Sequence, residues 1–194
     1  MFLNRGSLKS PWVQWEKAFS EDEITSIKEL KKLHKPEEGL VYSDGELVNV
    51  SDIRKSKAFF VNRSETVSWI FDSIEEKVAS VNRDFFNFDL YPTDSFQYTQ
   101  YDGSEKGFYG WHWDIHSGGE FEKQRKISVV LQLSDPSEYE GGDLYVNTCG
   151  NICQVPKEKG FLAFFPSWVI HQVTPVTKGL RETLVFWITG PDWR

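Results

Sequence analysis

Apolar residues in the first 84 positions recur every three or four residues in two stretches, which is the spacing of an amphipathic helix. Ser20 and Glu23 form a capping-box pattern ahead of the first stretch. Ser64 stands where it could cap the second stretch, which we expect to end near Asn82. The apolar faces of the two predicted helices consist of Ile24, Ile27, Leu30 and Leu33, and of Trp69, Ile70, Ile74 and Val78.

From Phe85 onward the pattern changes to short β-rich runs that are separated by turn residues. Two earlier runs, Trp12–Phe19 and Ala58–Val61, also have the character of strands. Residues 35–50 are loop-like, with a turn expected at Asp44-Gly45. The strands predicted in the second half are Phe86–Tyr91, Ser95–Tyr101, Lys126–Leu133, Asp143–Val146, Phe161–Phe165, Val169–Val173 and Glu182–Ile188.

Helices first and many short strands afterwards predict an α+β chain, mainly β. In such a chain an antiparallel double-sheet roll carries the N-terminal helices on one outer face. The length of 194 residues and the hydrophobic content of 39% suit one compact domain spanning residues 1–194. We expect residues 1–84 to supply helical support and the first strands, and residues 85–194 to form a jelly-roll core. The Gly- and charge-rich segments Asp102–Tyr109 and Ser117–Gln124 are candidate flaps at the mouth of the roll.

Composition narrows the classes of partner. The net charge of -7, without a basic stripe, argues against nucleic acid as a substrate. No apolar run approaches ~20 residues, and the N-terminus lacks the apolar region of a signal peptide. We therefore expect no membrane association and a cytoplasmic location. Cys149 and Cys153 could flank a hairpin turn at Gly150-Asn151, and we expect them to be reduced thiols. The sequence leaves the oligomeric state open.

The candidate chemistry begins in the segment from Tyr109 to Asp114. His112 and Asp114 are two residues apart, so both side chains share one face if the segment is extended. His171 is the best remaining candidate for a third ligand. Two histidines and one carboxylate form the facial triad of non-haem Fe(II) oxygenases, which leaves coordination positions open. Zinc prefers closed tetrahedral sites or a single open position, so we favour iron.

The residues after His171 add a cation. Residues Pro175 to Gly179 predict a turn between two β-rich runs, and a hairpin there would bring Arg181 back towards His171. On the second run Arg181 shares one face with Trp187, whereas the opposite face is mostly apolar and expected to be covered by helices. Arg is suited to bind a carboxylate through two hydrogen bonds. Together with the triad, Arg181 favours a dicarboxylate co-substrate such as 2-oxoglutarate.

With this triad and Arg181, the chain from Phe96 to Pro191 resembles the 2-oxoglutarate/Fe(II)-dependent dioxygenase superfamily and, within it, the prolyl 4-hydroxylase branch. The resemblance implies a double-stranded β-helix that uses Fe(II), 2-oxoglutarate and O2, with ascorbate as a possible reductant. It also implies that conversion of 2-oxoglutarate to succinate and CO2 is coupled to hydroxylation of a substrate. The pieces that carry the resemblance are Gln97…Tyr101, Tyr109-x-x-His112-x-Asp114, Gln124-Arg125, Glu140-Gly141-Gly142-Asp143 and His171-x-x-x-Pro175-Val176-x-x-Gly179-x-Arg181-x-x-x-x-x-Trp187.

The resemblance also implies roles for individual residues. Tyr101 matches the tyrosine that hydrogen-bonds the co-substrate, with Tyr98 as the substitute. Arg181 stands where collagen-type prolyl hydroxylases have Lys, and Arg is the usual choice elsewhere in the superfamily. The positions that contact a peptidyl proline in the family are matched by Tyr109, Arg125 and Trp187. A peptide or protein that contains proline is therefore the expected substrate.

Two other functions fit the same residues. A hydroxylase of a free amino acid or other small metabolite would need a closed pocket with a second carboxylate clamp, whereas a peptide hydroxylase needs an open groove. A non-catalytic cupin-like binding module would not require a complete triad together with Arg181.

Overall fold

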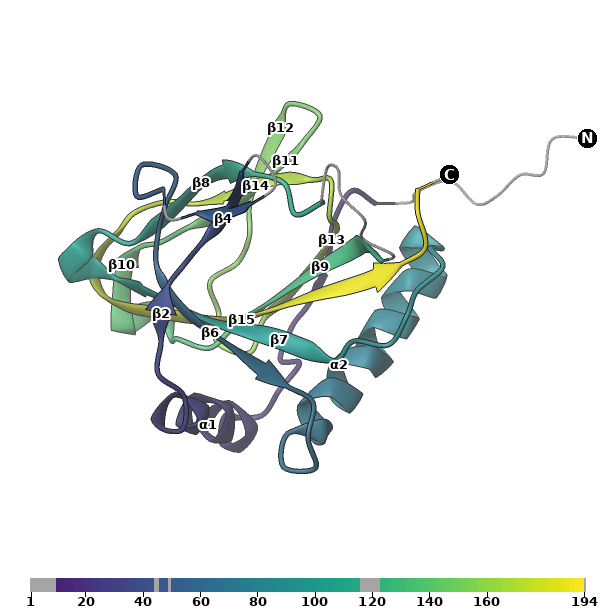
Figure 1. The fold of residues 1–194 in the computed structure, drawn as a ribbon, viewed down its shortest axis with the longest axis horizontal. Helices are drawn as coiled ribbons and strands as arrows, with labels where there is room; N and C mark the ends of the chain where they lie inside the picture. The colour runs from purple at the N-terminus through teal and green to yellow at the C-terminus, as the bar shows by residue number, and fades with distance from the viewer. Residues whose placement is uncertain (1–9, 44–45, 49, 116–122, 194) are drawn as a thin grey trace, which may run out of the picture.

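The computed structural model describes residues 10–43, 46–48, 50–115 and 123–193. Two antiparallel sheets dominate it (Figure 1). The larger one, called here the major sheet, contains in spatial order β1 (Val13–Trp15), β13 (Leu162–Pro166), β9 (Gln124–Gln132), β15 (Val176–Gly190), β7 (Ser95–Asp102), β6 (Lys57–Asn62) and β2 (Glu37–Glu38), and β10 (Tyr139–Gly141) pairs with β15. The minor sheet contains β12 (Asn151–Gln154), β11 (Leu144–Thr148), β14 (Ile170–Val173), β8 (Phe108–His112) and β5 (Arg54–Lys55).

The helices lie on one outer face of the major sheet, as Figure 1 shows for α1 (Glu21–Glu29) and α2 (Ser68–Val81). Short helical turns follow at Leu30–Lys32, Gly103–Glu105 and Pro136–Glu138, and a π-helical turn at Asn82–Phe86. A separate two-stranded ribbon consists of β3 (Val41–Ser43) and β4 (Glu46–Val48). No helix in the described ranges is long and apolar enough to cross a membrane.

Two apolar clusters explain this layering. On the helix side, Phe71 of α2 packs against Phe96 and Phe186, with ring centroids 5.2 and 5.9 Å apart. Between the two sheets lies a second cluster, to which both sheets contribute. Strand β13 shows the alternation, because Phe164 belongs to the helix-side cluster and Phe165 to the inner one. The predicted double-sheet roll with helices on one outer face is therefore confirmed.

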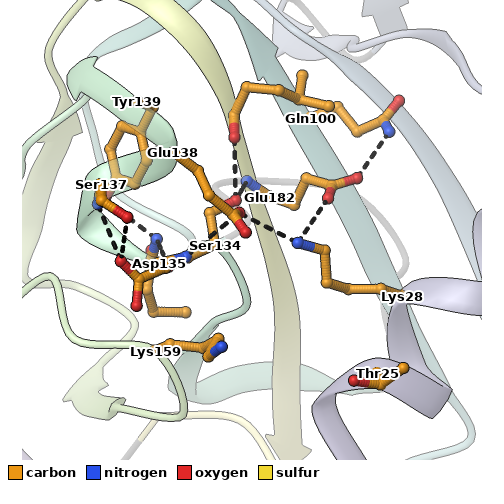
Figure 2. A network of polar contacts seen from close by, with 12 residues as sticks. Thr25, Lys28, Gln100, Ser134, Asp135, Ser137, Glu138, Tyr139, Lys159 and Glu182 are labelled. Carbon is orange, nitrogen blue, oxygen red and sulfur yellow. Dashed lines mark hydrogen bonds and ion pairs between the residues drawn. The ribbon is translucent and has the colours of Figure 1, made fainter. Parts of the chain in front are cut away.

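A buried carboxylate attaches α1 to the roll (Figure 2). Glu182 of β15 is 2% exposed and accepts hydrogen bonds from the Tyr98 hydroxyl at 2.9 Å and from Gln100 at 3.0 Å. Lys28 and Lys31 place their ammonium groups 3.5 and 3.0 Å from the same carboxylate. Burial alone would raise the pKa of Glu182, but these hydrogen bonds and Lys31 outweigh it and lower the pKa.

Several local predictions are confirmed. Ser20 caps α1 in a capping box with Glu23. Strands β7, β9, β11, β13 and β14 lie where strands were predicted, within a few residues. A hairpin does form between β11 and β12, but its turn lies at Cys149 and Gly150, one residue earlier than predicted, because Asn151 already pairs with Thr148. Cys149 therefore lies in the turn and does not flank it, and both cysteines are free thiols.

The predictions at the helix ends need correction. Ser64 does not cap α2, because its carbonyl closes a turn with the Val67 N–H, and the helix begins one turn later at Ser68. Leu33 does not face the core: α1 ends at Glu29, and Leu33 is 76% exposed. The opening strand is also shorter than predicted, since only Val13–Trp15 is paired.

No strand forms over Phe86–Tyr91. The chain continues from α2 into the π-helical turn, which ends at Asn87 with a positive φ of 57°. The Asn82 side chain bonds both the N–H and the carbonyl of Phe88, which holds the backbone in a bend. The aromatic run therefore packs against the helix-side cluster. Residues 35–50, predicted to be loop-like, include the short strands β2, β3 and β4, and the Asp44-Gly45 turn and most of the Ser117–Gln124 segment lie outside the described residues.

The predicted hairpin after His171 is wrong. Strand β14 pairs with β8 and β11, whereas β15 pairs with β7 and β9, so the chain passes from the minor to the major sheet near Pro175. The turn-like Gly179 serves a different contact: it has φ 73°, and an added Cβ would lie 2.0 Å from the carbonyl oxygen of Glu138, directly before the paired strand β10. Arg181 and His171 therefore lie on different sheets.

Candidate metal centre and co-substrate pocket

The three predicted metal ligands come together between the sheets. His112, at the end of β8, and His171, in β14, are directly paired across the minor sheet. Asp114 follows β8 by two residues, and its backbone N–H donates to the Ser167 carbonyl at 2.8 Å. The three potential ligand atoms all lie within 4.8 Å of one another. A shared divalent cation fits this donor set.

The hydrogen bonds of the two imidazoles orient them for metal binding. The Nδ1 atom of His112 lies 2.7 Å from the Gly110 carbonyl oxygen, and that of His171 lies 2.9 Å from the Val169 carbonyl oxygen. A carbonyl accepts only, so each Nδ1 carries a proton, and in the neutral ring Nε2 is then the atom with the free lone pair. The two Nε2 atoms face Asp114 at 3.8 and 3.5 Å.

The electrostatics favour the protonation states that a metal requires. Burial is the main cause that lowers the pKa of His112, and the neighbouring His171 lowers it further. For Asp114, burial would raise the pKa, but His171, His112 and the Arg125 guanidinium outweigh it and lower the pKa. At neutral pH His112 is therefore neutral and Asp114 is ionised, as metal ligands must be.

Two serines behind Asp114 were not singled out in the sequence. The Ser128 hydroxyl of β9 lies 2.6 Å from Asp114 Oδ2, and the Ser167 hydroxyl lies 3.0 Å from that of Ser128. Both serines are fully buried. No spacing motif links them to Asp114, because they reach it through the pairing of β9 with β13 and the turn that follows.

Arg181 lies in the major sheet directly opposite Tyr101 of β7. Its side chain is 3% exposed, and its guanidinium carbon lies 5.4 Å from the centre of the Tyr101 ring. Its Nε atom is buried and has no hydrogen-bond partner among the described residues. A buried cationic donor without a partner is costly, so this atom fits an anionic ligand such as the carboxylate of 2-oxoglutarate.

A small niche that is partly open to solvent adjoins Arg181. Its polar lining residues are Gln132, Tyr139 and Lys157. The three candidate metal ligands do not line it. Its apolar lining residues Leu144, Val155 and Phe161 belong to the inner cluster. Tyr98 does not reach this space, because its hydroxyl bonds Glu182 on the helix side. Of the two tyrosines considered from the sequence, only Tyr101 faces the inner cluster.

The three predicted substrate-binding residues lie beside the candidate metal ligands: Tyr109 and Arg125 contact them, and Trp187 contacts Arg125. The Tyr109 ring stacks on the His112 imidazole with centroids 3.4 Å apart. The Arg125 guanidinium lies 3.9 Å from the centre of the Trp187 ring, and one of its nitrogens lies 3.4 Å from the Asp114 carbonyl oxygen. The Trp187 indole N–H is buried and has no partner among the described residues.

Arg54 is a site residue that the sequence did not reveal. It pairs with Tyr109 across β5 and β8, is 6% exposed, and donates to the Ser56 hydroxyl at 2.7 Å and the Leu40 carbonyl at 3.0 Å. Its guanidinium carbon lies 4.8 Å from the centre of the Tyr109 ring. None of the ion pairs among the described residues includes Arg54, Arg125 or Arg181. Arg54 is identified as a site residue only by its position in the sheet opposite Tyr109.

Comparison with known proteins points to a family that uses a metal centre of this kind. Residues 96–189 match the family model described as the 2OG-Fe(II) oxygenase superfamily. A PKHD-type hydroxylase from Nitrosomonas europaea is 39% identical over 105 residues, which are 50% of this chain and 46% of that protein. One from Paraburkholderia xenovorans is 40% identical over 62 residues, covering 32% and 27%. The chain thus spans less than half the length of these curated relatives.

Solved structures with the same fold cover nearly the whole chain. A prolyl-4-hydroxylase from Pseudomonas putida has a TM-score of 0.73 at 18% identity and covers 95% of each chain. A prolyl hydroxylase from Trichoplax adhaerens, in complex with a peptide fragment of hypoxia inducible factor, has a TM-score of 0.77 at 16% identity. It covers 94% of this chain and 84% of that one.

Proposed function

Because this chain belongs to the 2OG-Fe(II) oxygenase superfamily, we propose that it couples decarboxylation of 2-oxoglutarate to hydroxylation of a proline residue in a peptide. The observation that carries the proposal is one roll that contains both a cluster of His112, Asp114 and His171 and a buried Arg181 whose Nε atom has no hydrogen-bond partner among the described residues. The cluster suits a divalent metal, and the arginine suits an anionic co-substrate.

The metal centre would be held by His112, Asp114 and His171. Bound Fe(II) would supply the activation of O2 that hydroxylation of an unactivated carbon requires. The chain's own part is to present two neutral imidazoles and one carboxylate from the minor sheet. By using only three ligands it leaves room for co-substrate and O2.

The co-substrate would place its distal carboxylate on Arg181. Arg181 is only 3% exposed, and in such a largely buried position a charge-assisted hydrogen bond is strong. Tyr101, directly opposite Arg181, would donate its hydroxyl proton to the same ligand. Burial is the main cause that raises the pKa of Tyr101, so this hydroxyl keeps its proton at neutral pH.

The prime substrate would dock between Tyr109, Arg125 and Trp187. A phenol and an indole give flat apolar walls for a pyrrolidine ring, and the Arg125 guanidinium and the Trp187 N–H are donors for peptide carbonyls. The solved structures that share this fold include prolyl hydroxylases, one of them bound to a peptide, which supports a peptide substrate here. We further propose ascorbate as a reductant. The two free thiols are consistent with a cytoplasmic location.

A small-molecule substrate is the second candidate, because Arg54 and Arg125 both lie near Tyr109 and neither forms an ion pair within 4 Å among the described residues. These two cations could form the second carboxylate clamp that a free amino acid or similar metabolite needs.

Mass spectrometry separates the two candidates. The purified chain is incubated with Fe(II), 2-oxoglutarate, O2 and either proline-containing peptides or free amino acids. The proposal predicts the gain of one oxygen atom on a peptidyl proline, together with succinate. If only free amino acids or metabolites gain oxygen and stimulate succinate formation, the peptide assignment is wrong.

A further inference from the structure

The three candidate ligands are held in position by different means. His112 and His171 are fixed by the strand pairing between β8 and β14 and by hydrogen bonds from their rings to backbone carbonyls. Asp114 lies beyond the end of β8, so no strand pairing holds it. Its carboxylate also faces both imidazoles, with Oδ1 3.8 Å from His112 Nε2 and Oδ2 3.5 Å from His171 Nε2. Either oxygen could therefore reach a shared ion.

The hydroxyl of Ser128 distinguishes the two oxygens. It lies 2.6 Å from Oδ2, and no other side-chain hydrogen bond to the Asp114 carboxylate is found among the described residues. The Ser128 hydroxyl has a single proton, which goes to the carboxylate. The Ser167 hydroxyl, 3.0 Å away, must then donate to Ser128. A chain of donors runs from Ser167 through Ser128 to Asp114, and each bond polarises the next.

We propose that Ser128, supported by Ser167, is a positioning residue that occupies Asp114 Oδ2 and leaves Oδ1 as the single metal-binding oxygen. A carboxylate that bound through both oxygens would take a coordination position that the co-substrate needs. The inference rests on the proposed function, since it assigns a role toward the metal and 2-oxoglutarate. Among the described residues, neither serine forms a hydrogen bond with His112 or His171, so both act on the site through Asp114.

The test measures binding and requires no turnover. Metal-free protein is titrated with Mn(II), a redox-stable substitute for Fe(II), and the Mn(II)-saturated protein is titrated with 2-oxoglutarate. Ser128→Ala removes the donor, Ser167→Ala removes only its support, and Ser128→Thr keeps the hydroxyl. Thermal unfolding of each metal-free variant reports whether it is folded.

Ser128→Ala is expected to weaken Mn(II) binding about 10- to 100-fold, the usual effect of losing a hydrogen bond to a ligating group. It should also weaken 2-oxoglutarate binding at saturating Mn(II). Ser167→Ala should show a smaller loss of the same kind, and Ser128→Thr should bind like the unmutated protein. If Ser128→Ala does not fold, Ser167→Ala carries the same test.

Two results would overturn the inference without touching the proposed function. One is a folded Ser128→Ala protein that binds Mn(II) and 2-oxoglutarate as tightly as the unmutated chain. The other is a loss in Ser128→Thr as large as that in Ser128→Ala, which would show that packing and not the hydroxyl matters. Failure of the unmutated protein to bind Mn(II) would instead overturn the proposed function, and this inference with it.

Discussion

The phenol ring of Tyr109 lies nearly parallel to the imidazole ring of His112, with centroids 3.4 Å apart and an angle of 11° between the planes. The guanidinium carbon of Arg54 lies 4.8 Å from the centre of the Tyr109 ring. Because Arg54 is itself held by Ser56 and Leu40, the stack fixes the phenol beside His112, a proposed metal ligand.

Replacing Arg54 with Met tests this stack. The change keeps an extended side chain but removes a cation–π contact of about 0.5–2 kcal/mol. We expect the KM for the prime substrate to rise about two- to thirtyfold, while Mn(II) affinity changes little. Steady-state kinetics at saturating 2-oxoglutarate measures the effect, and Arg54→Lys, which keeps the charge, should be less impaired. An unchanged KM in Arg54→Met would show that the stack does not position Tyr109.

Replacing Arg181 with Ala tests the co-substrate site. A buried ligand carboxylate would lose its guanidinium partner, which costs about 3–5 kcal/mol. The affinity for 2-oxoglutarate should therefore fall more than about a hundredfold, measured by calorimetry on Mn(II)-loaded protein. Arg83→Ala, at an exposed arginine, is the matched control and should bind normally. Similar affinities in the two variants would place the co-substrate elsewhere.

Replacing Trp187 with Phe tests the prime-substrate site. The indole N–H is buried without a partner among the described residues, so we expect it to donate to the substrate. Losing one neutral hydrogen bond of about 0.5–1.5 kcal/mol should weaken peptide binding about two- to tenfold. Binding of 2-oxoglutarate should stay the same, and Trp15→Phe serves as the control. A variant with unchanged peptide affinity but weakened 2-oxoglutarate binding would reverse the assignment.

Replacing Glu182 with Gln tests the anchor of α1 that Figure 2 shows. The folded-state pKa of Glu182 is lowered, so the carboxylate stabilises the fold above the unfolded pKa of about 4.3. This contribution is lost as pH falls through the lower folded value. At pH 7 the variant should lose roughly 1–3 kcal/mol of unfolding free energy. Urea unfolding should show the gap between the two proteins shrinking below about pH 4. A gap that is independent of pH would exclude this role.

The sequence predicted the features that depend on local spacing. His112 ends β8 and Asp114 follows it by two residues, so their closeness in the sequence was enough to place them together. The alternation along β15 likewise separated the inward Arg181 from the Leu184 and Phe186 face that packs on the helices. The capping box of α1 is equally local.

The features that depend on pairing between distant strands could not be predicted in this way. The turn residues before Arg181 were interpreted as a hairpin, but β14 and β15 belong to different sheets. Arg54 and Ser128 have no motif, because each reaches the site only through the strand in which it lies: β5 beside β8, and β9 beside β13. Ser64 failed as a cap because a turn over residues 64–67 precedes the helix, which begins only at Ser68.

The amount of succinate formed from 2-oxoglutarate by the purified chain tests the proposed activity most directly. With Fe(II), O2 and a proline-containing peptide, we predict succinate in equal amount to hydroxylated peptide. Both products should disappear in Asp114→Ala, which removes a metal ligand, and persist in Asp84→Ala, which changes an exposed aspartate. Failure of the iron-loaded chain to form succinate, or equal succinate from Asp114→Ala and the unmutated chain, would contradict the proposed activity.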